Sequence, residues 1–418
     1  MEKKFGDLLA RCPSFGYAGS AAYKPGLERM EAMCARMGNP ERGLRCVHVA
    51  GTNGKGSTCN FLCASLASMG FRVGLYTSPH IYDVRERIRI VSGGSYELIP
   101  PDALDEFACL YRDDAVSLGL SYFEIVTSAA FWYFSREKVD WVVLETGLGG
   151  RLDATNVVVP ALSVITNIGY DHMDVLGNTL PLIAQEKAGI IKPGVPVVVG
   201  ESDQETVAVF REVALRRGSP LFFADSCAPE VALPPDMDLK GCYQPKNLRT
   251  VLCALERLGF APDWDALSRA ASVCGFHGRW EKVCDNPLTI CDIGHNAHGL
   301  KYNFAQLSSM LDRGECSDVV MVYGSVADKD VDAVLRLLPS RAYIFFTAAS
   351  SPRALPAEEL FSRALSLRCD DSAFGGRWRC VPEVPDALAA ARKLCLSLEK
   401  PLLYVGGSTY VISECRFI

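Results

Sequence analysis

A glycine-rich stretch with one lysine, Gly51-Thr52-Asn53-Gly54-Lys55-Gly56-Ser57, is the clearest chemical signal in the sequence. It follows an apolar run and precedes a helix-like segment, so backbone N–H groups and the positive end of a helix can surround phosphate oxygens. Lys55 adds a cation at the same place. The common P-loop pattern would have Gly at position 49 and a hydroxyl at position 56, where this chain has Val49 and Gly56. The stretch still predicts a nucleoside triphosphate site.

Polar side chains also follow three other predicted strands. Ser78 comes after the strand over 72–76, Glu145 ends the strand over 140–145, and His172 follows the strand over 162–167. Ligands of open α/β sheets collect at the carboxyl ends of the strands, which places Ser78 near the phosphates. Mg²⁺ prefers oxygen ligands, so Glu145 is the first metal candidate and His172 the second. A Ser-Pro turn and a packing histidine are the ordinary alternatives.

The predicted elements place these loops at one edge of a parallel α/β sheet, because strand, loop and helix alternate along the chain. Further strands are predicted over 44–50 and 195–200, and helices over 27–37, 55–69, 122–134, 179–190, 245–258 and 264–273. The apolar run over 116–134 contains Glu124 and several hydroxyls, which favours a buried helix over a membrane span.

Asn286-Pro287 interrupts the pattern before a new strand over 288–292. We therefore predict a first, ATP-binding domain over 1–284, a linker over 285–287 and a smaller second α/β domain over 288–418. Strands of the second domain are predicted over 288–292, 319–323, 342–347 and 402–406.

Length and charge agree with an enzyme that acts on small molecules. A chain of 418 residues suggests two or three domains. Its net charge of -6 provides no positive field for nucleic acid or for an anionic membrane. The N-terminus has no secretory pattern, which predicts a cytoplasmic protein. Seventeen cysteines without a Cys-x-x-Cys pair favour free thiols.

The motifs together resemble the Mur ligase superfamily and, within it, the dihydrofolate synthase/folylpolyglutamate synthase family. The stretches that carry the resemblance are 51–57, 77–80, 145–156, 171–172 with 176–177, 186–193 and 292–296. The family joins L-glutamate to the carboxyl group of a pteroate or folate with ATP. The resemblance implies a Mur-ligase-like P-loop domain with a parallel-rich sheet and a smaller, Rossmann-like C-terminal domain.

The resemblance also implies roles for individual residues. Lys55, Lys187 and His295 match catalytic positions. Spacing alone favours a solvated helix charge for Lys187, but the matching family lysine is carbamylated and binds metal. The implied ATP-binding residues are Thr52, Asn53, Gly54, Lys55, Gly56, Ser57, Asn247, Arg279 and Asp292. The implied metal ligands are Ser78, Glu145, His172 and Lys187. The implied pterin contacts are Lys24, Pro25, Gly26, Ser121, Tyr122, Phe123, Glu124, Leu152, Asp153 and Ala154.

Two other functions are compatible with the sequence. One is a Mur-type ligase that acts on a peptidoglycan precursor, and the other is a nucleotide-binding regulator without ligase chemistry. The expected cofactors are ATP and Mg²⁺, with a carbamylated Lys187 and a monovalent cation such as K⁺ as further expectations. The expected partners are dihydropteroate or folate, L-glutamate and ATP, and the expected oligomeric state is a monomer.

Overall fold

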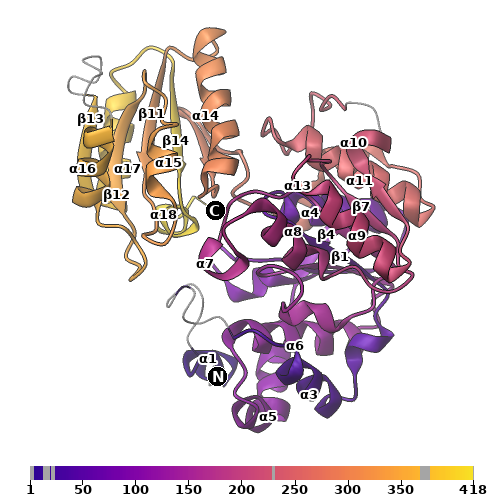
Figure 1. The fold of residues 1–418 in the computed structure, drawn as a ribbon. Helices are drawn as coiled ribbons and strands as arrows, with labels where there is room; N and C mark the ends of the chain where they lie inside the picture. The colour runs from indigo at the N-terminus through magenta and orange to yellow at the C-terminus, as the bar shows by residue number, and fades with distance from the viewer. Residues whose placement is uncertain (1–3, 13–18, 20–23, 228–230, 368–376, 418) are drawn as a thin grey trace. The chain divides into compact units, whose positions relative to one another are not determined.

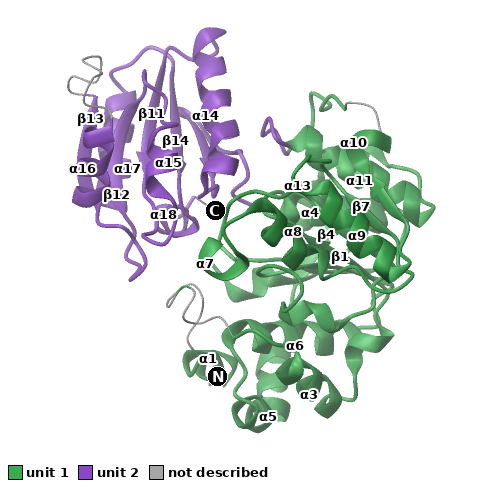
Figure 2. Ribbon diagram, viewed as in Figure 1, with its two compact units in different colours: residues 1–238, 244–276 green, residues 239–243, 277–418 purple. Residues whose placement is uncertain are grey.

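The computed structural model describes residues 4–12, 19, 24–227, 231–367 and 377–417 (Figure 1). The chain divides into two compact units (Figure 2). Unit 1 contains residues 1–238 and 244–276, and unit 2 contains residues 239–243 and 277–418.

The first unit therefore ends before the predicted linker. Residues 286 and 287 lie in the turn between β9 (Glu281–Asp285) and β10 (Leu288–Asp292), which pair as antiparallel neighbours in unit 2. The Asn-Pro sequence thus forms a hairpin turn and does not join two domains. The change of unit occurs between Phe276 and His277.

Unit 1 is built on an eight-stranded sheet in the order β4-β3-β2-β5-β1-β6-β7-β8. Strands β2, β5, β1, β6, β7 and β8 are parallel, and β3 and β4 add an antiparallel edge. The bounds are β1 (Cys46–Ala50), β2 (Val73–Tyr76), β3 (Ile88–Ser92), β4 (Ser95–Leu98), β5 (Trp141–Glu145), β6 (Leu162–Ile165), β7 (Val197–Val199) and β8 (Leu221–Phe223). Every residue of β1, β2, β5, β6 and β7 is buried, as expected for parallel strands covered on both faces.

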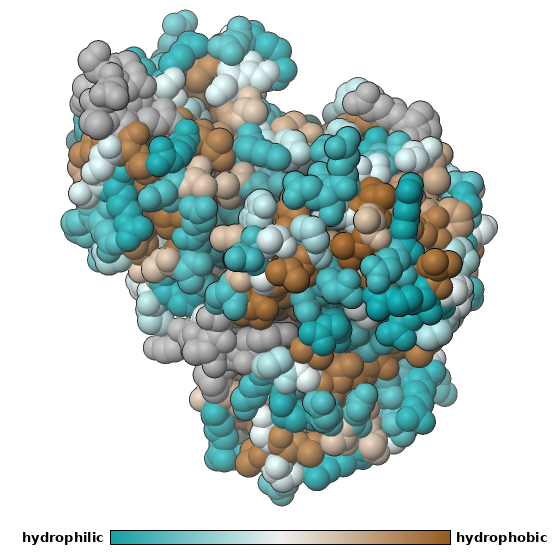
Figure 3. Space-filling view, viewed as in Figure 1, coloured by the Kyte–Doolittle hydropathy of each residue, from teal (hydrophilic) through white to brown (hydrophobic). Residues whose placement is uncertain are grey.

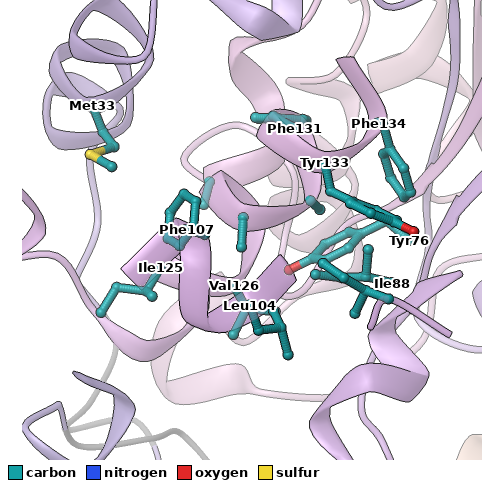
Figure 4. Close-up of a cluster of buried hydrophobic side chains, with 14 of the residues drawn as sticks. Met33, Tyr76, Ile88, Leu104, Phe107, Ile125, Val126, Phe131, Tyr133 and Phe134 are labelled. Carbon is teal, nitrogen blue, oxygen red and sulfur yellow. The ribbon is translucent and has the colours of Figure 1, made fainter. Parts of the chain in front are cut away.

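Helices cover this sheet in two groups. Helix α4 (Lys55–Ser68) packs against β1, β2, β3 and β5 and against α11 (Gln244–Leu258), α12 (Trp264–Ser268) and α13 (Ala270–Cys274). The other group, α1 (Lys4–Ala10), α3 (Glu28–Arg36), α5 (Pro101–Ser117) and α6 (Tyr122–Arg136), forms an apolar core with alternate β5 residues Val142 and Leu144. Figure 4 shows part of this core around Tyr76, Phe107 and Phe134.

The remaining elements of unit 1 are shorter or lie near β6 and β7. Helices α8 (Leu180–Ala188) and α9 (Val207–Arg217) pack on those two strands. The others are α7 (Met173–Leu176), α10 (Ala224–Cys227) and the 3-10 turns η2 (Pro40–Gly43), η3 (Val84–Arg87) and η4 (Ala154–Val157).

Two predicted helices are divided in the structure. The segment over 264–273 forms α12 and α13, because Arg269 has a non-helical backbone between them. The apolar run over 116–134 is split where α5 ends, since Gly119 has φ of 64° and Ser121 caps α6. No described helix is long and apolar enough to cross a membrane.

Unit 2 contains a six-stranded sheet in the order β13-β12-β11-β14-β10-β9, parallel except for β9. The other strands are β11 (Asp318–Tyr323), β12 (Tyr343–Ala348), β13 (Trp378–Glu383) and β14 (Pro401–Gly406). Helices α14 (Ala297–Asp312), α15 (Val331–Leu335) and α16 (Ala357–Leu367) share one core with the sheet, and α17 (Val384–Cys395) and α18 (Thr409–Cys415) pack against it as well.

The visible surface is mixed in polarity. On the face drawn in Figure 3, apolar groups alternate with hydrophilic ones.

Candidate active site

The glycine-rich loop joins β1 to α4 at the carboxyl edge of the first sheet. Gly54, the N-cap of α4, has φ of 79°, and a Cβ there would lie 2.1 Å from Asn247 Oδ1. A Cβ at Gly51 would lie 1.8 Å from Thr166 Oγ1. Only glycine fits both positions, and the first N–H groups of α4 have no intrahelical acceptor. The residues therefore form a tight backbone cradle that fits a phosphate.

Thr52 and Asn53 hold this loop against the segment after β6. Thr52 Oγ1 donates to Gly169 O at 3.1 Å and accepts from Gly169 N at 3.0 Å. Asn53 N donates to Asn167 Oδ1 at 3.0 Å, and Thr166 Oγ1 donates to Asn53 O at 2.6 Å. The structure thus shows both residues as anchors of the loop.

Two lysines converge on one carbonyl of the loop. Lys55 Nζ donates to Gly51 O at 3.1 Å, and Lys187 Nζ, from α8, donates to the same oxygen at 2.9 Å. Lys187 is 3% exposed, so the surface-charge interpretation of this residue is wrong. Burial and the neighbouring positive charge of Lys55 lower the pKa of Lys187 to about 7, although Asp171 opposes the shift. A large fraction of Lys187 is therefore the neutral, nucleophilic amine near pH 7.

Glu145 lies beside the start of α4. Its carboxylate is buried, and Oε2 accepts from the backbone N of Ser78 at 2.9 Å. A Cβ on Gly56 would lie 3.8 Å from the same oxygen. The structure thus brings together three sequence-predicted groups: the glycine loop, the Ser78 loop and the Glu145 carboxylate.

His172 lies in the loop after β6, the loop that anchors Thr52. It has φ of 49°, and its Nε2 lies 3.8 Å from Asp171 Oδ1. Within the described part of the chain, no group of three or more His, Cys, Asp or Glu side chains lies close enough together to hold a metal ion. The predicted ligand set would therefore be mixed, with one carboxylate, one hydroxyl, one imidazole and Lys187.

Gln244 is a site residue that the sequence did not reveal. It is fully buried, its Nε2 donates to Ser57 Oγ at 3.1 Å, and its Oε1 accepts from Asn247 Nδ2 at 2.8 Å. These hydrogen bonds connect the start of α11 to Ser57 at the start of α4, and Asn247 Oδ1 lies next to Gly54. Its contact with ATP stays a prediction. The only sequence signal for Gln244 was its position one turn before Asn247.

The predicted pterin contacts at the start of α6 divide into two kinds. Ser121 and Glu124 form a capping box, and Glu124 also pairs with Arg29 at 3.0 Å. Both residues thus stabilise the helix. The Phe123 ring lies against the loop after β5, where a Cβ on Gly147 would be 2.5 Å from its Cζ. Tyr122 and Phe123 are both partly buried and packed against the core, and their contact with a pterin stays a prediction.

Asp153 organises the loop after β5. It is 3% exposed and accepts from Leu148 N at 2.8 Å, from Thr155 N at 3.0 Å and from Thr155 Oγ1 at 2.5 Å. Burial raises the pKa of Asp153, although these hydrogen bonds oppose the shift. Since Thr155 Oγ1 donates its single proton to Asp153, its contact of 2.8 Å with His48 Nε2 makes that nitrogen the donor.

The other predicted pterin contacts lie on this loop and before α3. Leu152 is partly exposed, and Ala154 begins η4 and is buried. Lys24 is exposed, and its Nζ donates to Gly119 O at 2.8 Å. Pro25 and Gly26 follow it, and Gly26 has φ of 114°.

In unit 2, the predicted ATP contact Asp292 is buried and accepts three hydrogen bonds. Its oxygens accept from Tyr243 OH at 2.7 Å, Trp280 N at 2.8 Å and Gly294 N at 2.7 Å. Burial and the adjacent Asp292 raise the pKa of Tyr243. Tyr243 is not among the residues predicted from the sequence. Arg279, also of unit 2, donates through Nη1 to Gly278 O at 3.1 Å.

His295 lies in the loop between β10 and α14. Its Nδ1 lies 3.2 Å from Ile293 O, and because a carbonyl can only accept, Nδ1 is the donor of this hydrogen bond. Asn296 caps α14 by accepting from Gly299 N at 2.8 Å. Both units therefore present polar loops at the carboxyl ends of parallel strands.

Comparison with known proteins shows the family of this chain. Residues 49–226 match the Mur ligase middle domain, and residues 278–406 match the Mur ligase glutamate ligase domain. The dihydrofolate synthase/folylpolyglutamate synthase of Bacillus subtilis is 36% identical over 81% of this chain and 84% of its own length. The chain belongs to the dihydrofolate synthase/folylpolyglutamate synthase family. It is an ATP-dependent glutamate ligase that forms a C–N bond, which confirms the predicted enzyme class.

Solved structures of the family agree with the fold. E. coli FolC in complex with DHPP and ADP is 31% identical, with a TM-score of 0.79 over 94% of this chain and 92% of that chain. A Yersinia pestis bifunctional folylpolyglutamate synthase/dihydrofolate synthase, complexed with AMPPNP and a Mn ion, is 30% identical, with a TM-score of 0.81 over 98% and 97%. The predicted fold class is confirmed, and the peptidoglycan and regulator alternatives gain no support.

Proposed function

We propose that this family member adds L-glutamate to the carboxyl group of dihydropteroate, of a folate, or of both, through an acyl phosphate. The observation that carries the proposal is the convergence of Lys55 and Lys187 on Gly51 O, in a phosphate-shaped loop beside the buried Glu145. The DHPP and ADP bound by E. coli FolC and the AMPPNP and Mn bound by the Yersinia enzyme support the same ligand classes.

The reaction proceeds in two steps. A carboxylate oxygen of the acceptor attacks the γ-phosphorus of ATP, the bond to the β,γ-bridging oxygen breaks, and ADP leaves. The amine of glutamate then attacks the acyl carbon, inorganic phosphate leaves, and the amine loses a proton. Phosphoryl transfer depends mainly on positioning and charge neutralisation, which the N-terminus of α4 and Lys55 provide. The roles of Arg279 and His295 stay predictions from the sequence.

Magnesium fits the donors around this loop. Ser78, Glu145 and His172 would hold it, together with a carbamate on Lys187, and the ion would neutralise charge on the phosphates. The carbamate forms when neutral Lys187 attacks CO₂ and loses a proton, so a buried amine with a pKa of about 7 suits the modification. The carbamate is an anion. The modification would therefore replace the positive charge of Lys187, which burial disfavours, with a group that can bind a metal ion. K⁺ binding, a monomeric state and a cytoplasmic location stay predictions from the sequence.

The test is ADP release by the purified protein with Mg²⁺-ATP and L-glutamate, using dihydropteroate, tetrahydrofolate or no acceptor. Turnover with dihydropteroate alone identifies a dihydrofolate synthase. Turnover with tetrahydrofolate alone identifies a polyglutamylating enzyme, and turnover with both acceptors identifies the bifunctional enzyme. No acceptor-dependent turnover would refute the proposal. A parallel reaction with UDP-muramyl precursors checks the peptidoglycan alternative.

A further inference from the structure

An arginine that none of the roles above uses lies beside the Ser78 loop. Arg87 ends η3, and its carbonyl accepts from the backbone N of Thr77 at 3.1 Å. Its Nε donates to His80 Nδ1 at 2.8 Å, and its guanidinium carbon lies 5.7 Å from the centre of the Tyr122 ring. The guanidinium is thus held by an imidazole on one side and an aromatic face on the other.

Arg87 forms no ion pair with any carboxylate in the part of the chain that the structure describes. Among the described residues, no Asp or Glu oxygen lies within 4.0 Å of its guanidinium nitrogens, whereas Arg85, on the same short turn, pairs with Asp83 at 2.7 Å. A guanidinium keeps its charge at any working pH and has five N–H donors, of which His80 takes one. A partly buried, oriented guanidinium of this kind is suited to a planar anion.

The position of Arg87 indicates which anion that is. On one side, Thr77 leads directly to Ser78, whose N–H bonds the Glu145 carboxylate beside the glycine loop. On the other side, Tyr122 precedes Phe123, whose ring lies against Gly147. Arg87 therefore lies between the proposed phosphate and metal loops and the proposed wall for the flat ring of the acceptor.

We propose that Arg87 binds the carboxylate of the acceptor, the group that receives the phosphoryl group, and that His80 and Tyr122 orient its guanidinium. The inference rests on the proposed function, since it assumes an acceptor with a flat ring at one end and a reactive carboxylate at the other. Two anions must approach each other for the first step, and a fixed cation beside the carboxylate reduces their repulsion. The structure also explains why His80 can orient Arg87: its Nδ1 is the acceptor, so its proton is on Nε2.

The test compares dihydropteroate with an analogue in which hydrogen replaces the carboxyl group. Isothermal titration calorimetry with a non-hydrolysable ATP analogue present gives the dissociation constant of each ligand for wild type, Arg87→Gln, Arg87→Lys and Arg85→Gln. Wild type should prefer the carboxylate ligand at least tenfold, and Arg87→Gln should reduce the preference to about twofold or less without changing the affinity for the analogue. Arg87→Lys should keep part of the preference, and Arg85→Gln should keep all of it.

Kinetics provide a second measurement on the same variants. Arg87→Gln should raise the KM for dihydropteroate at least tenfold while the KM for ATP stays within about twofold, which a merely unfolded variant would not do. A carboxylate preference in Arg87→Gln equal to that of wild type and Arg85→Gln would overturn the inference while leaving the proposed function intact. If wild type neither binds nor turns over any pterin acceptor, the proposed function fails and this inference fails with it.

Discussion

Replacing His48 with glutamine should remove part of the acid sensitivity of the protein. His48 is fully buried in β1, and its Nε2 donates to Thr155 Oγ1, which in turn donates to Asp153. Burial, with a smaller effect of the Lys192 charge, lowers the pKa of His48 to about 3. The amide nitrogen of a glutamine at this position can replace Nε2 as the donor, so the variant keeps the hydrogen bond and loses the titration.

The sign and size follow from proton linkage. In the unfolded chain the pKa of His48 returns to about 6.5, so below that pH the unfolded state takes up a proton that the native state refuses. The stability contributed by the neutral ring is fully present above about pH 6.5 and is lost as the pH falls toward about 3. At about pH 5 the loss is RT ln(1 + 10^1.5), or about 2 kcal/mol, and at about pH 7.5 it is about 0.1 kcal/mol.

The assay is urea unfolding of wild type and His48→Gln at these two pH values, followed by tryptophan fluorescence. The decrease in the free energy of unfolding between them should be about 2 kcal/mol smaller in the variant. His80, whose pKa burial also lowers to about 3, remains in both proteins and cancels from the comparison. Equal pH dependence in the two proteins would show that His48 is not a buried neutral histidine, and the reasoning about its network would be wrong.

Three further predictions concern the active site. Lys187→Ala should lower turnover at least a hundredfold, and wild type, but not the variant, should give a carbamate signal in ¹³C NMR with labelled bicarbonate; an active, unlabelled variant would contradict the role of Lys187. Gly54→Ala should cost about 1–2 kcal/mol in unfolding free energy, because φ is 79° and its Cβ would displace Asn247, and calorimetry should show weaker ATP binding. Asp292→Asn should lower the free energy of unfolding of unit 2 by about 1–3 kcal/mol, because the NH₂ group of asparagine would face protein donors. Tyr243→Phe removes only one of these hydrogen bonds and should lower the same free energy by about 1 kcal/mol, measured by thermal unfolding.

The local chemistry of unit 1 could be predicted from the sequence because it depends on short-range patterns. A glycine loop between an apolar run and a helix has few possible structures, and polar residues at the ends of parallel strands must share an edge. Glu145 and Ser78 therefore lie together, as their strand positions indicate. The prediction of a linker over 285–287 was wrong because Asn-Pro indicates a turn without indicating what the turn connects. Only the pairing of β9 with β10 shows that this turn joins two strands of one sheet.

What only the tertiary structure decided is which charged and polar groups are buried, and against what. Lys187 has the spacing of a surface lysine, and its low pKa arises because folding buries it and also places it beside Lys55 on one carbonyl oxygen. Gln244 and Arg87 carry no motif by themselves. The hydrogen bond of Gln244 with Ser57 joins two segments that are far apart in the chain. The hydrogen bond of Arg87 with His80 forms within the connection between β2 and β3. The sequence determined the kinds of groups present and their strand-end positions, while burial and pairing, which set their charge and reactivity, depend on residues that only the folded chain brings together.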